Sequence, residues 1–277
     1  MQIDLAPGRV IHKIFKNWVL TFWVEYVILI TVNERNKEKK MNFPYKRVLI
    51  IDTETANSIE QPLPYDMGWA ILDVPSQTYV STHSYVCAEI YLDHELMQSA
   101  YYAKKIPQYE ADLASGKRTL ARLSTIRKVL ADEIKAFGVE AVGAYNMGFD
   151  RKALNNDQRL ITSSKFRWFF PYEMEYFCIW NMACTSILRS KRFIEWAEEN
   201  ECISAHGNIQ TSAEVAYRYL LKNTNFDEQH MGFEDVVIET EIFFAVLNSR
   251  MKYETAISPA CWRIPQKRRK ELAEGLE

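Results

Sequence analysis

The hydrophobic and polar positions of the chain become regular from about residue 47 and then change period several times. Residues 48–51 form a continuous apolar run rich in β-branched side chains, which predicts a strand buried on both faces. Two further runs, 67–74 and 78–86, are separated by a Pro-Ser-Gln segment and predict a β-hairpin. The first part of the domain is therefore expected to be a sheet.

Helical spacing takes over from about residue 93 to 137, with interruptions near Pro107 and Gly116. Six apolar positions fall on one stripe of this region: Leu120, Leu123, Ile126, Val129, Leu130 and Ile134. Further elements are predicted as a strand at 139–145, a short helix from Phe149, a last strand at the end of the aromatic stretch 166–180, and helices at about 182–198, 211–222 and 235–250. This alternation predicts one α/β domain over residues 45–250.

Residues 1–40 differ from the rest of the chain. They hold seven Lys or Arg and four Asp or Glu, and residues 18–32 form a 15-residue apolar run. Because a membrane span needs about 20 residues and this run contains Glu25, we favour a packed strand or helix over a membrane anchor. A third interpretation is that Met41 is the natural start. Residues 1–40 are therefore an N-terminal extension of uncertain status, and no membrane partner is expected.

Composition places the chain among ordinary globular proteins. Its 277 residues are 48% apolar and 25% charged, which excludes collagen, a coiled coil and wholesale disorder. The net charge of −2 means that any affinity for nucleic acid must be local. Five widely spaced cysteines without a CxxC pair disfavour disulfides and structural zinc, and they favour a reducing, cytoplasmic environment.

Asp52 and Glu54 form the first of three polar clusters that lie where strands end or helices begin. Side chains at i and i+2 of an extended chain point to the same face, and carboxylate pairs suit Mg²⁺ or Mn²⁺ rather than zinc. The chain contains a second such triplet, Asp93-His-Glu95. Because helical residues follow this second triplet, Asp93 is predicted to be a helix N-cap instead.

The other two clusters are Asn146-Met-Gly-Phe-Asp150, after a predicted strand, and His230-Met-Gly-Phe-Glu-Asp235, before the last helix. Each taken alone also has an ordinary structural interpretation. Asn146 would form a turn, Asp150 would favour a helix dipole, and Asp235 would cap a helix. A lone histidine near a loop is more often structural than catalytic.

The order of the three clusters changes this interpretation. D-x-E after a buried strand, N-x-x-F-D after a later strand and H-x4-D at a helix start together resemble the DEDD 3′–5′ exonucleases of the histidine-containing (DEDDh) subtype. That family includes the proofreading subunit of bacterial polymerase III, ribonuclease T and oligoribonuclease. The resemblance covers about residues 45–250 and implies a ribonuclease-H-like fold with a mixed five-stranded sheet flanked by helices.

The resemblance also implies roles for individual residues. Asp52, Glu54, Asp150 and Asp235 would bind two Mg²⁺ or Mn²⁺ ions, and His230 would be the general base. Contacts with the terminal nucleotide are implied for Thr53, Thr55, Asn146 and Phe149. The expected partner is nucleic acid, foremost a single-stranded 3′ end, with replication or repair proteins as further candidates.

Two other functions stay open. An inactive nucleic-acid-binding or scaffold relative would be expected to lack one or more of the acids, and a ribonuclease-H-like endonuclease would not need the second and third clusters. The aromatic residues of 166–180 suit either core packing or base stacking. Several basic groups suit either phosphate contacts or solvated helix faces: Lys104, Lys105, Lys117, Arg118, Arg122 and the basic C-terminal tail within 251–277.

Overall fold

The computed structural model describes residues 43–163, 165 and 167–275. Contacts within the chain divide it into two units, Met1–Asn42 and Phe43–Glu277. The expectations for residues 1–40 and for Met41 as a start lie outside the described residues. All elements named here belong to the second unit.

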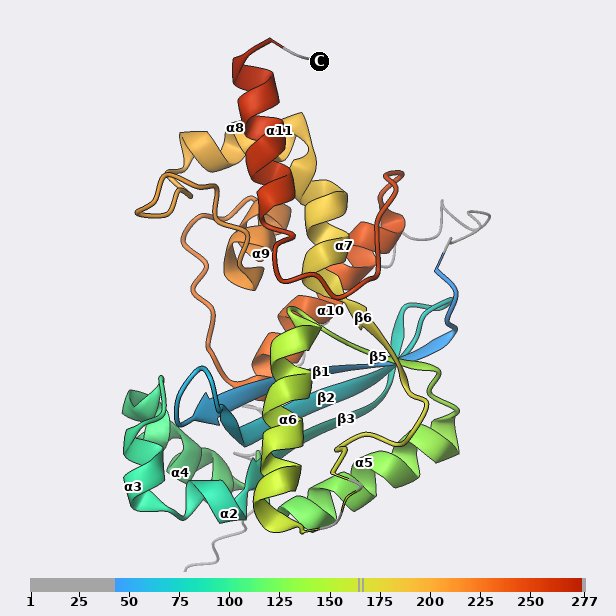
Figure 1. The fold of residues 1–277 in the computed structure, drawn as a ribbon, viewed down its shortest axis with the longest axis vertical. Helices are drawn as coiled ribbons and strands as arrows, with labels where there is room; N and C mark the ends of the chain where they lie inside the picture. Colours follow the sequence, from blue (N-terminus) through green and yellow to red (C-terminus); the bar gives the residue numbers. More distant parts are fainter. Residues whose placement is uncertain (1–42, 164, 166, 276–277) are drawn as a thin grey trace, which may run out of the picture. The chain divides into compact units, whose positions relative to one another are not determined.

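A mixed sheet forms the centre of this unit (Figure 1). Its strands are β1 (Arg47–Ala56), β2 (Leu63–Asp73), β3 (Thr78–Cys87), β4 (Thr119–Ala121), β5 (Ala141–Ala144) and β6 (Glu175–Cys178). They lie in the order β4-β3-β2-β1-β5-β6, and β2 alone runs antiparallel to the other described strands. The α/β class and the hairpin are confirmed, and helices flank a mixed sheet as expected.

The prediction of five strands is wrong, because the described residues form six. The additional strand is β4, and Leu120, which the helical stripe included, lies in it and is 41% exposed. A three-residue strand has too few positions to show an alternating pattern, so local periodicity does not distinguish it from a helix.

Helices cover the sheet and extend beyond it. Those before β6 are α2 (Ala88–Tyr91), α3 (His94–Gln98), η2 (Ala103–Lys105), α4 (Ile106–Ser115), α5 (Leu123–Phe137) and α6 (Met147–Ile161). Those after it are α7 (Ile179–Thr185), η3 (Ile187–Arg189), α8 (Lys191–Glu199), α9 (Ala213–Leu221), α10 (Gly232–Asn248) and α11 (Arg263–Ala273). The helix predicted at 182–198 is thus divided, and the one predicted from Phe149 begins earlier, at Met147.

The core lies on both faces of the sheet because successive β1 residues point to opposite sides. Leu49 and Ile51 join a cluster with apolar residues of α5 and α6. Val48 and Ile50 are equally buried on the other face, where α10 packs against β1 and β2 (Figure 1). The predicted double-sided burial of this strand is confirmed.

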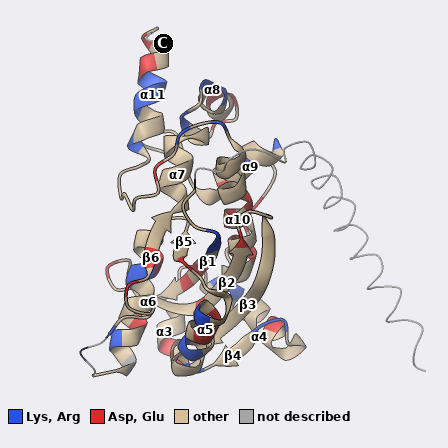
Figure 2. Ribbon diagram, turned by 90° about the vertical axis from the view of Figure 1, so that its right-hand side faces the viewer, with Lys and Arg blue, Asp and Glu red and all other residues tan. Residues whose placement is uncertain are grey.

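Part of the segment expected to be a basic tail forms helix α11, along which basic positions follow one another (Figure 2). This helix packs against α7, α8 and η3. Arg269 pairs with Glu198 of α8 at 2.7 Å. The basic residues of α11 are therefore partly engaged in intramolecular contacts.

Candidate active site

Asp52 and Glu54 lie within β1 rather than beyond its end, because the strand continues past them. Both point to the face that α10 covers. Asp52 is opposite Gly68 of β2, and a Cβ atom at Gly68 would lie 2.3 Å from the backbone nitrogen of Phe233. A residue without a side chain is therefore required for α10 to begin directly over the β1 acids.

Helix α10 brings the third predicted cluster to these acids. His230, with a φ of 49°, precedes the helix, and Asp235 lies in its first turn. One ligand atom each of Glu54, His230 and Asp235 lies within 4.8 Å of the other two. The structure therefore brings residues from the first and third clusters together. Asp235 is not the N-cap of the helix, since that position is Met231.

Asp150 comes from the first turn of α6 and is 3% exposed. Its Oδ1 accepts a hydrogen bond of 2.8 Å from the Thr53 hydroxyl, which links the second cluster to β1. Asn146 precedes the helix in the left-handed region, with a φ of 86°, and its side chain makes no capping bond. Thr55, Asn146 and Phe149 are half-buried. Their roles toward a nucleotide stay predictions.

The site carboxyls have strongly perturbed acidity. Burial, followed by the charges of Glu239 and Asp150, raises the pKa of Asp52 well above its usual range. Burial raises the pKa of Asp150 to about 7, and burial with the charge of Glu228 raises that of Asp235 to about 8. Without cations, several of these groups therefore hold protons at neutral pH.

His230 is placed by an aromatic stack. Its ring lies on that of Tyr102 at a centroid distance of 4.2 Å and an interplanar angle of 12°, and its Nδ1 is 3.6 Å from Glu228 Oε2. Burial and the nearby charge of Lys105 lower the pKa of His230. The imidazole is therefore neutral at neutral pH, which is the form that accepts a proton.

Several residues at the site were not predicted from the sequence. Glu239, 3% exposed, lies one turn after Asp235 and so on the same face of α10, a spacing that could have indicated it. Tyr102, the residue before η2, was also not predicted, because the sequence carried no signal for its contact with His230. Lys105, which the sequence placed among several basic groups, lies in η2. The aromatic ring that stacks on His230 and a nearby positive charge thus come from a segment that is distant in sequence from the three motifs.

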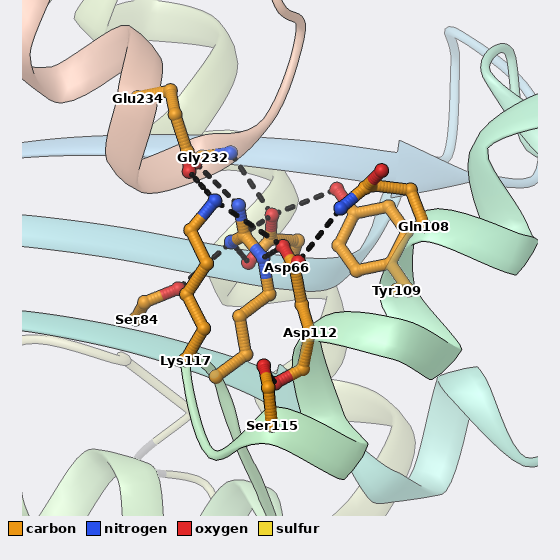
Figure 3. Close-up of polar contacts among 10 residues, drawn as sticks. Asp66, Ser84, Gln108, Tyr109, Asp112, Ser115, Lys117, Gly232 and Glu234 are labelled. Atoms are coloured by element: carbon orange, nitrogen blue, oxygen red, sulfur yellow. Dashed lines mark hydrogen bonds and ion pairs between the residues drawn. The ribbon is translucent and has the colours of Figure 1, made fainter. Parts of the chain in front are cut away.

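A buried ion network holds the start of α10 in place (Figure 3). Asp66 Oδ2 accepts hydrogen bonds from the Gly232 amide at 2.9 Å and the Tyr109 hydroxyl at 2.8 Å. Arg118 Nη1 lies 2.9 Å from the same oxygen, and its guanidinium also contacts Asp112 and Glu234. Asp66 thereby fixes the backbone between His230 and Asp235.

The predicted alternatives for Arg118, a phosphate contact or a solvated face, are both wrong. The residue is 3% exposed and satisfied inside the protein. The N-cap prediction for Asp93 is confirmed, since its Oδ1 accepts a 3.0 Å hydrogen bond from the Leu96 amide. The aromatic stretch divides: Phe169, Phe170 and Phe177 are buried, whereas Trp168 and Tyr172 are 49% and 86% exposed.

The residues present suit a divalent cation. Two carboxylate oxygens and an imidazole nitrogen that could bind a metal lie within 4.8 Å of one another. Asp235 Oδ1 and Glu239 Oε2 are buried oxygens without a hydrogen-bond partner among the described residues. Buried charged oxygens without partners are costly, and a bound cation would satisfy them.

All five cysteines are buried and free. No helix of the described part of the chain is long and apolar enough to cross a membrane.

No protein-family model and no curated protein sequence matches the chain. Solved structures do match it. Three of them are 3′-exonucleases. One, described as 3′-end specific recognition of histone mRNA stem-loop by 3′-exonuclease, has 12% identity and a TM-score of 0.47, covering 77% of this chain and 87% of its own.

A second structure is the nuclease domain of 3′hExo, a DEDDh family member, bound to rAMP. It has 12% identity and a TM-score of 0.45, with 77% of this chain and 97% of that chain covered. A third, a full-length 3′-exonuclease, has 13% identity and a TM-score of 0.48, covering 76% and 85%. These proteins are of the type that the sequence motifs resemble. At these scores, the roles of individual residues depend on the site geometry of this chain.

Proposed function

We propose that this protein is a metal-dependent 3′–5′ exonuclease that releases nucleoside monophosphates from the 3′ end of DNA or RNA. The observation that carries the proposal is the meeting of Glu54, His230 and Asp235 within 4.8 Å. Asp52 and Asp150 are the neighbouring acids, and the direction of digestion follows from the resemblance of the motifs. A single-stranded 3′ end is the proposed substrate, and a replication or repair protein as a partner stays a prediction.

His230 would act as general base, a role that contributes about 10²–10⁴-fold to the rate. It takes a proton from the water that attacks phosphorus, while the bond from phosphorus to the 3′ oxygen of the preceding nucleotide breaks. That oxygen leaves with a proton, and the released nucleotide keeps a 5′-phosphate. Stacking on Tyr102 holds the imidazole in place for this transfer. Two Mg²⁺ or Mn²⁺ ions held by Asp52, Glu54, Asp150 and Asp235 would supply positive charge at the phosphate.

Digestion of 5′-labelled and 3′-labelled oligonucleotides, single- and double-stranded, of DNA and RNA, with and without Mn²⁺, tests the proposal. We expect a ladder shortened from the 3′ end and mononucleotide products. His230→Ala and Glu54→Gln should slow digestion by about 100-fold or more. The matched control is Glu95→Gln, which alters the second D-x-E triplet at an exposed position of α3 and should digest at the wild-type rate.

The products separate the two alternative functions. Internal fragments would identify an endonuclease. Binding of oligonucleotides without cleavage would identify an inactive relative. A wild-type rate in the Glu54→Gln or His230→Ala protein would refute the assignment of the site.

A further inference from the structure

Glu239 is a buried acid that none of the three sequence motifs includes. It lies one helical turn after Asp235 on α10 and is 3% exposed, and its Oε2 has no hydrogen-bond partner among the described residues. Neighbouring positions of the same helix, such as Val236 and Ile242, are buried apolar residues. A buried carboxylate oxygen in this setting is costly unless something binds it.

A hydrogen bond from the end of β5 shows where Glu239 points. Ile50 of β1 is opposite Gly143 of β5, so Asp52 lies at the level of Tyr145. The Tyr145 backbone donates a hydrogen bond to the Glu239 carboxyl. Glu239 thus reaches from α10 to the end of β5, at the level of Asp52 on the neighbouring strand.

The charges that act most strongly on Glu239 are those of other acids. The largest charges acting on it come from Asp150 and Asp235, and the largest charge acting on Asp52 is that of Glu239 itself. The positive charge of Lys105 acts on Glu54 and Asp235. Glu239 therefore adds one more buried negative charge beside the acids that the sequence motifs include.

We propose that Glu239 is a fifth acidic ligand of the site and that it helps to hold one of two divalent cations. The buried, unpartnered oxygen of Glu239 and the hydrogen bond that its carboxyl accepts from the Tyr145 backbone, at the level of Asp52, carry this assignment. The proposal rests on the proposed function for the identity of the cations, Mg²⁺ or Mn²⁺, and deepens it by assigning one more residue to their binding.

A purely structural role predicts different behaviour. A structural Glu239 would serve through its shape and its bond from Tyr145, and glutamine has nearly the same shape and can accept that bond. A metal ligand needs the negative charge, which glutamine lacks. Glu239→Gln should therefore weaken cation binding while the metal-free protein stays folded.

Isothermal titration of the metal-free full-length protein with MnCl₂ tests the proposal directly. We expect two Mn²⁺ ions per wild-type chain. In Glu239→Gln, one site should be retained and the other weakened by about 10–100-fold or more. Glu241→Gln is the matched control: it lies two residues further on the same helix, its Oε2 accepts a hydrogen bond from the Tyr217 hydroxyl, and it should bind two ions like the wild type.

The melting temperature with and without Mn²⁺ gives a second readout. The rise caused by Mn²⁺ should be smaller in Glu239→Gln than in the wild type, because only folded protein binds the ions. If the glutamine variant does not fold, Glu239→Met decides in its place, because methionine has a similar size and leaves no buried polar group without a partner. Wild-type Mn²⁺ stoichiometry and affinity in the variant that folds would overturn the proposal.

The same preparations separate this inference from the proposed function. Two Mn²⁺ sites that depend on Glu239, without digestion of any oligonucleotide, would support the fifth ligand and refute the exonuclease. Digestion with unchanged Mn²⁺ binding in Glu239→Gln would support the exonuclease and refute the fifth ligand. A wild-type protein that binds no Mn²⁺ refutes the inference directly.

Discussion

Replacing Arg118 by methionine removes the only guanidinium of the buried network that Figure 3 shows around Asp66. The Arg118 side chain is 1% exposed and the Asp66 side chain 0%, so the substitution leaves an uncompensated charge inside the protein. Breaking a buried pair by removing one partner costs about 3–5 kcal/mol. For a domain of 150–250 residues, this lowers the melting temperature by about 6–20 °C.

The loss should depend on pH. Burial raises the pKa of Asp66 even beside Arg118, which lowers it. Without Arg118 this pKa rises further above its unfolded value, so the folded variant takes up a proton as the pH falls and regains stability. The difference in unfolding free energy between wild type and Arg118→Met should therefore be largest at pH 8 and smaller at pH 5.

Urea unfolding followed by circular dichroism at the two pH values measures this difference. Lys117→Met is the matched control, because Lys117 belongs to the same network but its side chain is 52% exposed. Exposed pairs contribute about 0–1 kcal/mol, so this variant should be nearly as stable as the wild type. Arg118→Met no less stable than Lys117→Met would refute the view that the network anchors α10.

Three further predictions concern the site. Burial raises the pKa of Asp235 to about 8, above its unfolded value, so the metal-free protein should lose stability as the pH rises from 5 to 9. Melting curves in EDTA test this, and a stability that rises over this range would contradict it; Mn²⁺ should reduce the decline. Lys105→Met should raise the pKa of His230, because the charge of Lys105 lowers it. The acidic limb of the pH–rate profile should then move to higher pH. An unchanged profile and an unchanged histidine NMR titration would argue against this. Gly68→Ala should displace the start of α10, since the new Cβ would lie 2.3 Å from Phe233 N, and should lower kcat/KM; wild-type kinetics would show that the close approach is not needed.

The elements that the sequence predicted well are those with long local patterns. The buried stripe of α5 repeats over enough residues to show a helical period, whereas β1 and the hairpin are marked by apolar runs bounded by turn residues. The three residues of β4 do not, and their strand character depends on pairing with β3. Strand β1 also continues through Asp52 and Glu54, because β2 pairs with it beyond the apolar run.

The sequence by itself determined which acids and which histidine are candidates, because the type and order of residues in three short clusters are local properties. Only the tertiary structure decided that Glu54 meets His230 and Asp235, that Tyr102 stacks on the histidine, and that Glu239 is buried next to the end of β5. It also showed that Arg118 is buried rather than available to a phosphate. Burial, charge compensation and stacking arise from the packing of segments that are distant in the chain, and no pattern of neighbouring residues specifies them.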